Sequence, residues 1–192
     1  MISLNELIVM MGLAISEPSL PIETPKNVDV DPIQATCLAE NVYHESRNQG
    51  TAGWSAVISV TLNRVKDKRF PNTICEVVKQ GPTRESWKKN GTYYPIKHRC
   101  QFSWYCDGKA DKIHKKDKRI YKEIYNLAYV SLIKGITILD ITDGATHYHA
   151  DYVFPAWRKS KTKTVEIGDH IFLSLIHISE PTRPLYISYA VF

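Results

Sequence analysis

The sequence predicts an α+β fold in which helices dominate and the β structure is small. Three segments, 31–50, 51–67 and 117–134, carry apolar residues at helical spacing and are long enough to be helices. The apolar segments nearer the end, 144–152 and 165–172, are short enough to be strands. With 192 residues, of which 43% are hydrophobic, the chain has the length and composition of a single domain with its own core.

The first predicted helix has a clear start. Asp31 is a typical N-cap, Pro32 suits the first helical position, and the polar stretch 47–50 ends the helix. The preceding segment, 1–30, combines a short apolar run with several prolines among polar residues. We therefore expect an N-terminal lead-in over 1–30, either a weak signal or a flexible segment, and a folded domain from residue 31.

Glu45 is the most informative residue of this helix. Leu38, Val42 and Glu45 lie at positions i, i+4 and i+7, so they share the face that should be buried. A carboxyl group placed there loses the solvation of its charged form, its pKa rises, and it can serve as a general acid near neutral pH. The alternative is a rim position, with an ion pair to Arg47 or Arg64.

The middle of the chain is less regular. The second predicted helix, 51–67, is apolar on most sides, which indicates burial, and 73–80 is a short apolar segment that fits a strand or a helix. Residues 81–111 are rich in Gly, Pro, Trp and Tyr without clear periodicity, and so long a loop in a compact domain is usually a binding element. The third predicted helix, 117–134, ends at Gly135.

The net positive charge of the chain indicates which classes of partner it can bind. A net charge of +5, with basic residues concentrated in 109–122, favours an anionic partner such as nucleic acid, a membrane surface or a wall polymer. No nucleic-acid module is visible, and aromatic residues do not alternate with the lysines as they do in single-strand binders. No stretch is long enough for an ordinary transmembrane helix. We therefore expect no nucleic-acid partner and no stable membrane insertion.

The cysteines and histidines leave some chemistry open. Four cysteines, of which Cys100 and Cys106 could close a small loop, allow three disulfide pairings, and they fit both an exported and a reduced protein. His147 and His149 would lie on one face of a strand, as in a metal pair, but no third ligand stands at a suitable spacing. We expect no metal and no cofactor.

The last twenty residues, 173–192, break with the rest of the chain. They resemble the translation of a transposase adaptor followed by a flow-cell adaptor used in short-read DNA libraries. We therefore treat them as not native, and expect the folded domain to span 31–172.

Four blocks of the sequence together resemble the SleB-type cell wall hydrolases, a family known from spore cortex lysis and from phage and bacterial wall-degrading proteins. The blocks are 37–47, 56–65 with 70–78, 100–108, and 144–149 with 167–172. The resemblance implies a lysozyme-like α+β domain, with the family's catalytic glutamate at Glu45. It also implies a phage or prophage lysis protein, or a bacterial remodelling enzyme, that works as a monomer at the cell wall, in the periplasm or outside the cell.

The activity implied by this resemblance is cleavage of the glycan strands of peptidoglycan by a lytic transglycosylase, with Glu45 as the single general acid and base. Three alternatives stay open. A hydrolytic muramidase or glucosaminidase would need a second carboxylate, a zinc amidase would use His147 and His149, and a non-catalytic module would only bind peptidoglycan. The candidates for a second carboxylate are Asp107, Asp140, Asp143 and Asp151.

Substrate binding is expected from two segments. Gln101 and Ser103 can exchange hydrogen bonds with the N-acetyl and hydroxyl groups of sugars. Flat faces for pyranose rings are offered by Phe102, Trp104 and Tyr148, with core packing as the alternative for Phe102 and Trp104. His147 and His149 are expected to hydrogen bond to substrate or to lie in the core.

Overall fold

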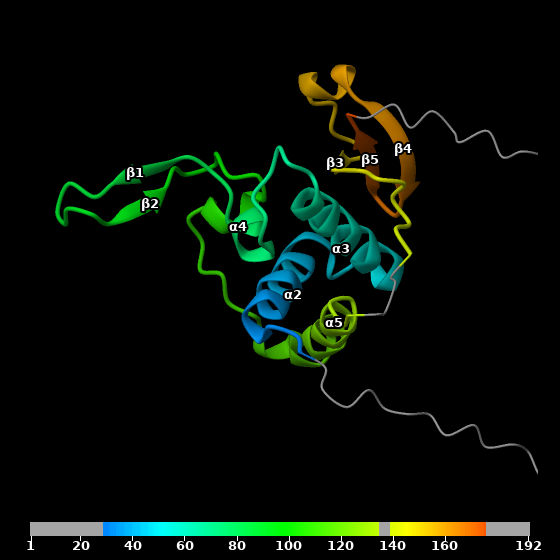
Figure 1. The fold of residues 1–192 in the computed structure, drawn as a ribbon, viewed down its shortest axis with the longest axis horizontal. Helices are drawn as coiled ribbons and strands as arrows, with labels where there is room; N and C mark the ends of the chain where they lie inside the picture. Colours follow the sequence, from blue (N-terminus) through cyan, green and yellow to red (C-terminus); the bar gives the residue numbers. More distant parts are fainter. Residues whose placement is uncertain (1–28, 135–138, 176–192) are drawn as a thin grey trace, which may run out of the picture.

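The structure is a computed structural model, and it describes residues 29–134 and 139–175. The helices are α2 (Pro32–Ser46), α3 (Gly50–Lys66), α4 (Ile74–Val78) and α5 (Lys118–Val130). A hairpin is formed by β1 (Thr83–Glu85) and β2 (Tyr93–Pro95), and a second sheet by β3 (His147–Ala150), β4 (Thr162–Ile167) and β5 (His170–Ser174). Three short 3₁₀ helices are η1 (Ser103–Cys106), η2 (Lys115–Asp117) and η3 (Ala156–Ser160). The predicted helix-dominated α+β fold is confirmed (Figure 1).

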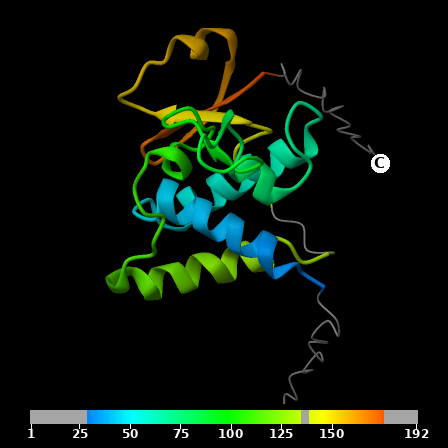
Figure 2. The same cartoon turned by 90° about the vertical axis from the view of Figure 1, so that its left-hand side faces the viewer.

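The elements are arranged in layers around the first two helices. α2 and α3 form the middle of the molecule, with α5 packed on one side and the three-stranded sheet on the other (Figure 2). In this sheet all pairs are antiparallel and the order is β3-β5-β4, so that Tyr148 lies opposite Phe172. The β1–β2 hairpin projects away from the helices (Figure 1).

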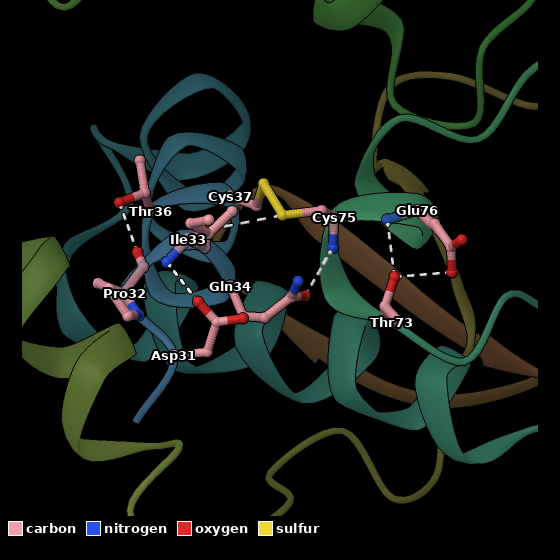
Figure 3. Close-up of a disulfide and its surroundings, with 9 residues drawn as sticks. All are labelled: Asp31, Pro32, Ile33, Gln34, Thr36, Cys37, Thr73, Cys75 and Glu76. Atoms are coloured by element: carbon pink, nitrogen blue, oxygen red, sulfur yellow. Dashed lines mark hydrogen bonds between the residues drawn. A yellow bond between two sulfur atoms is a disulfide. The ribbon is translucent and has the colours of Figure 1, made fainter. Parts of the chain in front are cut away.

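The start of α2 is held in two ways. The Asp31 side chain accepts a hydrogen bond from the backbone N–H of Ile33 at 2.8 Å, which confirms the predicted N-cap. A disulfide between Cys37 and Cys75 then joins the second turn of α2 to α4 (Figure 3). The Gln34 side chain reinforces this junction by accepting a hydrogen bond from the Cys75 N–H at 3.0 Å.

The apolar segment 73–80 is a helix, α4. Thr73 caps it, because its hydroxyl accepts a hydrogen bond from the Glu76 N–H at 3.3 Å and donates one to the Glu76 carboxylate at 2.7 Å. Both bonds are made by the Thr73 side chain, and the Thr-x-x-Glu spacing, which is typical of a helix start, distinguishes helix from strand in this segment (Figure 3).

The core has two connected parts. The larger part is built from α2, α3, α4, α5 and η1, with Leu38, Val42 and Val57 completely buried in it. The smaller part lies between α3 and the sheet, where Phe172 of β5 packs with Ala56 and Val60. This second contact decides where β3 stands relative to the end of α2.

Four predicted elements need correction. The helix predicted over 117–134 is shorter, because α5 ends at Val130. The segment 81–111 contains the β1–β2 hairpin and η1, and the hairpin was missed because strands of three residues are too short to show a period. The segment 165–172 is two strands joined by a turn, where Gly168 has a φ of +57°. Strand β5 also continues through Leu173 and Ser174, which are buried, so the folded part extends past residue 172.

The predicted lead-in at 1–30 and most of the tail at 173–192 lie outside the described residues. In the described ranges, no helix combines the length and the hydrophobicity needed to cross a membrane.

Candidate active site

Glu45 lies in the last turn of α2, where its carboxyl group faces the sheet. The residue is partly exposed, but its carboxyl group is almost enclosed by protein. The hydroxyl of Tyr148, from β3, donates a hydrogen bond of 2.7 Å to Oε2 of Glu45. Burial raises the pKa of Glu45, and this effect outweighs the lowering by the Tyr148 hydrogen bond and by the positive charge of Arg64.

Arg64 is the cation of this site. It is buried at the end of α3, where its Nε donates a hydrogen bond of 2.7 Å to the backbone oxygen of Thr146. Its guanidinium lies over the ring of Phe102, 4.7 Å from the centroid. Nη1 of Arg64 is buried without a hydrogen-bond partner among the described residues. Arg64 thus braces the strand that carries Tyr148 and places a positive charge near Glu45.

Arg47 has a different place. Its Nε lies 3.8 Å from the carboxylate of Asp117, which also accepts a hydrogen bond of 2.7 Å from the hydroxyl of Tyr43. Of the two arginines considered as partners of Glu45, the one that acts on its pKa is Arg64.

Two hollows in the surface meet at Glu45. One has a volume of about 410 Å³, and its lining includes Gln101, Ser103, Tyr148, His149 and His170. The other has a volume of about 390 Å³, and its lining includes His44, Ser103, Trp104, Asp107 and Asp111. Glu45 and Ser103 belong to both linings, so the two hollows adjoin at the carboxyl group, and we refer to them together as the groove.

Most of the predicted binding residues line this groove or its continuation. Gln101 and Ser103 are exposed, and the backbone N–H of Gln101 is tied to the Gln80 oxygen at 2.9 Å. A third hollow, of about 340 Å³, continues from Gln101 and Tyr148 to His147.

The two histidines of β3 both contact one tryptophan. The rings of His147 and His149 lie 5.7 and 5.8 Å from the ring of Trp157. Burial, aided by the positive charges of Arg64 and Lys161, lowers the pKa of His147 to about 4, so it is neutral at neutral pH. Among the residues that the structure describes, no three His, Cys, Asp or Glu side chains are grouped to hold a metal ion.

Phe102 and Trp104, which were predicted to offer faces to sugar rings, each border a hollow beside Glu45 but have little exposed surface for such a contact. Phe102 is 2% exposed and Trp104 is 9% exposed, and both belong to the hydrophobic core. The indole N–H of Trp104 donates to the Asn41 side chain at 3.0 Å, and its ring stacks on His44 at 4.4 Å. The alternative, core packing, is therefore correct for both rings.

The exposed aromatic residues of this surface lie elsewhere and were missed. They follow β3, where Tyr152 is 79%, Phe154 69% and Trp157 40% exposed. Tyr152 lines the hollow with Glu45, and Trp157 lines the hollow with His147. The signal in the sequence was three aromatic residues within six positions at the end of a predicted strand and just after it.

The candidates for a second carboxylate have different surroundings. Although burial raises the pKa of Asp140, hydrogen bonds from Thr142, Asn63 and the Gly144 N–H lower it more, so this carboxylate anchors a turn. Asp107 lines the groove together with Glu45. Asp111, which was not predicted, lines the same hollow, and burial raises its pKa.

The chain is similar to a known protein family and to two solved structures. A family model described as Cell Wall Hydrolase matches residues 48–173. The catalytic domain of the germination-specific lytic transglycosylase SleB from Bacillus anthracis is similar, with 25% identity, a TM-score of 0.51, and coverage of 78% of this chain and 100% of that chain. The catalytic domain of the Bacillus cereus SleB protein has 24% identity, a TM-score of 0.48, and coverage of 79% and 97%. No curated protein matches the chain.

Proposed function

We propose that this chain, which belongs to the cell wall hydrolase family, cleaves the glycan strands of peptidoglycan as a lytic transglycosylase. Membership confirms the family predicted from the four sequence blocks, and it makes the chain an enzyme of the cell wall. The narrower activity is supported by the similar structure from Bacillus anthracis, which is named a lytic transglycosylase. The family match begins at residue 48, so the role of Glu45 is argued from the geometry of the site.

The observation that carries the proposal is an enclosed carboxyl group with a raised pKa in the wall of a long groove. In its protonated form, Glu45 transfers its proton to the oxygen that bridges two sugars, and the bond between this oxygen and C1 of the muramic residue breaks. The resulting carboxylate then accepts the proton of the 6-hydroxyl of the same residue. The 6-oxygen bonds to C1 and closes an anhydro ring, so no water is consumed.

Tyr148 and Arg64 support the charge that Glu45 acquires. Burial favours the protonated acid before the reaction, because it raises the pKa of Glu45 by penalising the carboxylate. Once the proton has left, the Tyr148 hydroxyl at 2.7 Å and the Arg64 guanidinium stabilise the negative charge. Both groups are held before substrate binds, by the β3–β5 pairing and by the bond from Arg64 to Thr146.

The carboxylates near Glu45 bear on whether the reaction uses one acid or two. The groups that act on the pKa of Glu45 are Tyr148 and Arg64, with no second carboxylate among them. Burial lowers the pKa of His44, and the charges of Asp111 and Asp107 raise it, so these two carboxylates act on the neighbouring histidine. Hydrolysis by an inverting or retaining mechanism needs a second carboxyl group about 5–9.5 Å away. Asp107 and Asp111 line one hollow with Glu45, so the preference for the transglycosylase rests on the similar structure of that name, and the products decide it.

The test compares Glu45→Gln with Glu40→Gln. Glu40 lies on the same helix, and burial also raises its pKa, so the same chemical change is made outside the proposed site. We expect Glu45→Gln to fold but to lose cleavage of purified peptidoglycan by about 10²–10⁴-fold, because the amide has no proton to transfer. Glu40→Gln should retain cleavage.

Mass spectrometry of the released muropeptides tests the product. Anhydromuramic ends are expected from the wild-type protein. Reducing ends would replace the transglycosylase by a hydrolase, and activity retained in Glu45→Gln would refute the role of Glu45. A wild-type protein that binds peptidoglycan and releases no fragments would be a non-catalytic module.

A further inference from the structure

A hollow of about 500 Å³ lies beside strands β4 and β5, and its rim is strongly cationic. The basic residues in its lining are Arg158, Lys159, Lys161 and Lys163. No acidic residue belongs to the lining. Four positive charges around one depression attract an anionic group.

Three of these charges are not neutralised. Lys163 forms an ion pair with Glu166 at 2.6 Å, whereas Arg158, Lys159 and Lys161 have no ion pair within 29–134 and 139–175. Two of them lie over aromatic rings instead. The Arg158 guanidinium is 4.6 Å from the centroid of Phe154, and Lys161 Nζ is 5.0 Å from that of Trp157. Cation–π contacts hold these side chains in place without cancelling their charge.

The cationic hollow lies across edge strand β3 from Glu45. His149, Ile171 and Leu173 line it, and they alternate along their strands with Tyr148 and Phe172, which face α3. His149 lines both this hollow and the one beside Glu45. Lys161 lines both this hollow and the third hollow, which it shares with Gln101 and Tyr148. A polymer bound beside Glu45 can therefore place a side group in the cationic hollow only if that group passes around the edge of β3, through the third hollow that Lys161 shares.

Apart from His149, the remaining lining is apolar. Phe154, together with Ile171 and Leu173 of β5, forms this part of the hollow. Cationic groups above an apolar wall fit an amino-acid chain that has carboxylates and aliphatic side chains. A phosphodiester polymer would place fewer apolar groups against this wall.

We propose that this hollow binds carboxylates of the peptide stem that is attached to the glycan strand. The proposal rests on the proposed function, because the sugars of the strand enter the groove and the stem is their anionic branch. The hollow thus distinguishes strands that carry stems from bare strands.

The activity test uses Arg158→Gln combined with Lys159→Gln, two residues that line the cationic hollow and neither of the hollows beside Glu45. The control is Lys115→Gln with Lys116→Gln, which removes the same charge from exposed residues of η2. On intact peptidoglycan we expect the first variant to raise KM about tenfold, and the control to change it little. On glycan strands freed of stems by an amidase, both variants should match the wild type.

A binding test separates this proposal from the proposed function. The full chain is titrated with a soluble stem tetrapeptide, and with the same peptide amidated at its carboxyl groups, at low salt and without any cleavage. We expect the free acid to bind more tightly than the amide, and Arg158→Gln with Lys159→Gln to remove the difference. Thermal melting of each variant checks that the fold is intact.

Several outcomes would overturn the stem subsite. They are an equal rise in KM on intact and stem-free strands, no rise on either, or no preference of the wild type for the free acid. If the variant raises KM on whole walls, and this rise is lost once the phosphate polymers of the walls are removed, the hollow binds phosphate groups instead. A wild-type chain that distinguishes the two peptides but cleaves no strand would refute the proposed function and leave the stem subsite standing.

Discussion

Tyr148→Phe tests whether the hydrogen bond to Glu45 acts on the reaction. The substitution removes one hydroxyl, which donates to Oε2 of Glu45 at 2.7 Å. It keeps the ring, which packs against Phe172 and His170 with centroid distances of 5.5 and 5.2 Å. The change is therefore confined to the partner of the proposed acid.

The size of the effect follows from the charge on Glu45. A hydrogen bond to a neutral acceptor contributes about 0.5–1.5 kcal/mol, and one to a charged acceptor about 1.5–3 kcal/mol. Glu45 is neutral before it transfers its proton and gains negative charge in the transition state, so only the difference, about 1–1.5 kcal/mol, affects kcat. We expect kcat to fall about 5- to 13-fold.

The pH profile gives the specific signature. A general acid is active while it is protonated, so activity is lost as pH rises through the pKa of Glu45. Burial raises that pKa and the Tyr148 hydrogen bond lowers it. Without the hydroxyl the pKa rises further, and the alkaline limb of the kcat profile moves to higher pH. A purely structural role of Tyr148 would not move this limb.

The assay is release of soluble fragments from purified peptidoglycan, measured across the pH range for the wild type and two variants. Tyr43→Phe is the matched control, because its hydroxyl also donates to a carboxylate, Asp117, at 2.7 Å. Its alkaline limb should coincide with that of the wild type. An unmoved limb in Tyr148→Phe, or one displaced to lower pH, would refute the reasoning.

Two further predictions concern stability and the aromatic residues of the groove. Replacing Cys37 and Cys75 by Ala should lower the free energy of unfolding by about 4 kcal/mol, and replacing Cys100 and Cys106 by Ala should lower it by about 2 kcal/mol. The difference is expected because the first disulfide closes a loop of 38 residues and the second a loop of 6. Urea titrations measure both losses, and equal losses would contradict the dependence on loop length. Phe102→Ala should lower the free energy of unfolding by about 3–5 kcal/mol as a core cavity, whereas Tyr152→Ala should leave stability nearly unchanged and raise KM for glycan strands. The reverse pattern, with Phe102→Ala stable, would restore Phe102 as a sugar platform.

Local signals in the sequence located the helices well. Asp31 and Pro32 marked the start of α2, and the apolar positions around Leu38 and Val42 placed Glu45 on the face that is buried. In the last turn of α2, the i, i+4, i+7 spacing that starts at Leu38 leaves Glu45 as the one acidic residue on the buried face. Caps and helical periodicity depend on residues a few positions apart, so the sequence displays them directly.

The burial of the aromatic rings next to Gln101 could not be predicted from the sequence. Polar and aromatic residues alternate in 101–104, and this pattern does not show whether the aromatic rings are exposed or buried. Phe102 and Trp104 turned inward because Arg64 and Asn41, from α3 and α2, provide their partners. A 3₁₀ turn closed by the Cys100–Cys106 disulfide has no period from which burial can be inferred.

The sequence by itself determined the fold class, the family and an acid on a buried helix face, because these follow from local patterns and from motifs. Only the tertiary structure decided what surrounds that acid. Tyr148 is 103 residues away from Glu45 along the chain, and it reaches the carboxyl group because Phe172 packs the sheet against α3. The cationic hollow likewise exists only where η3, β4 and β5 meet. Contacts of this range depend on how whole elements pack, and no spacing within one element contains that information.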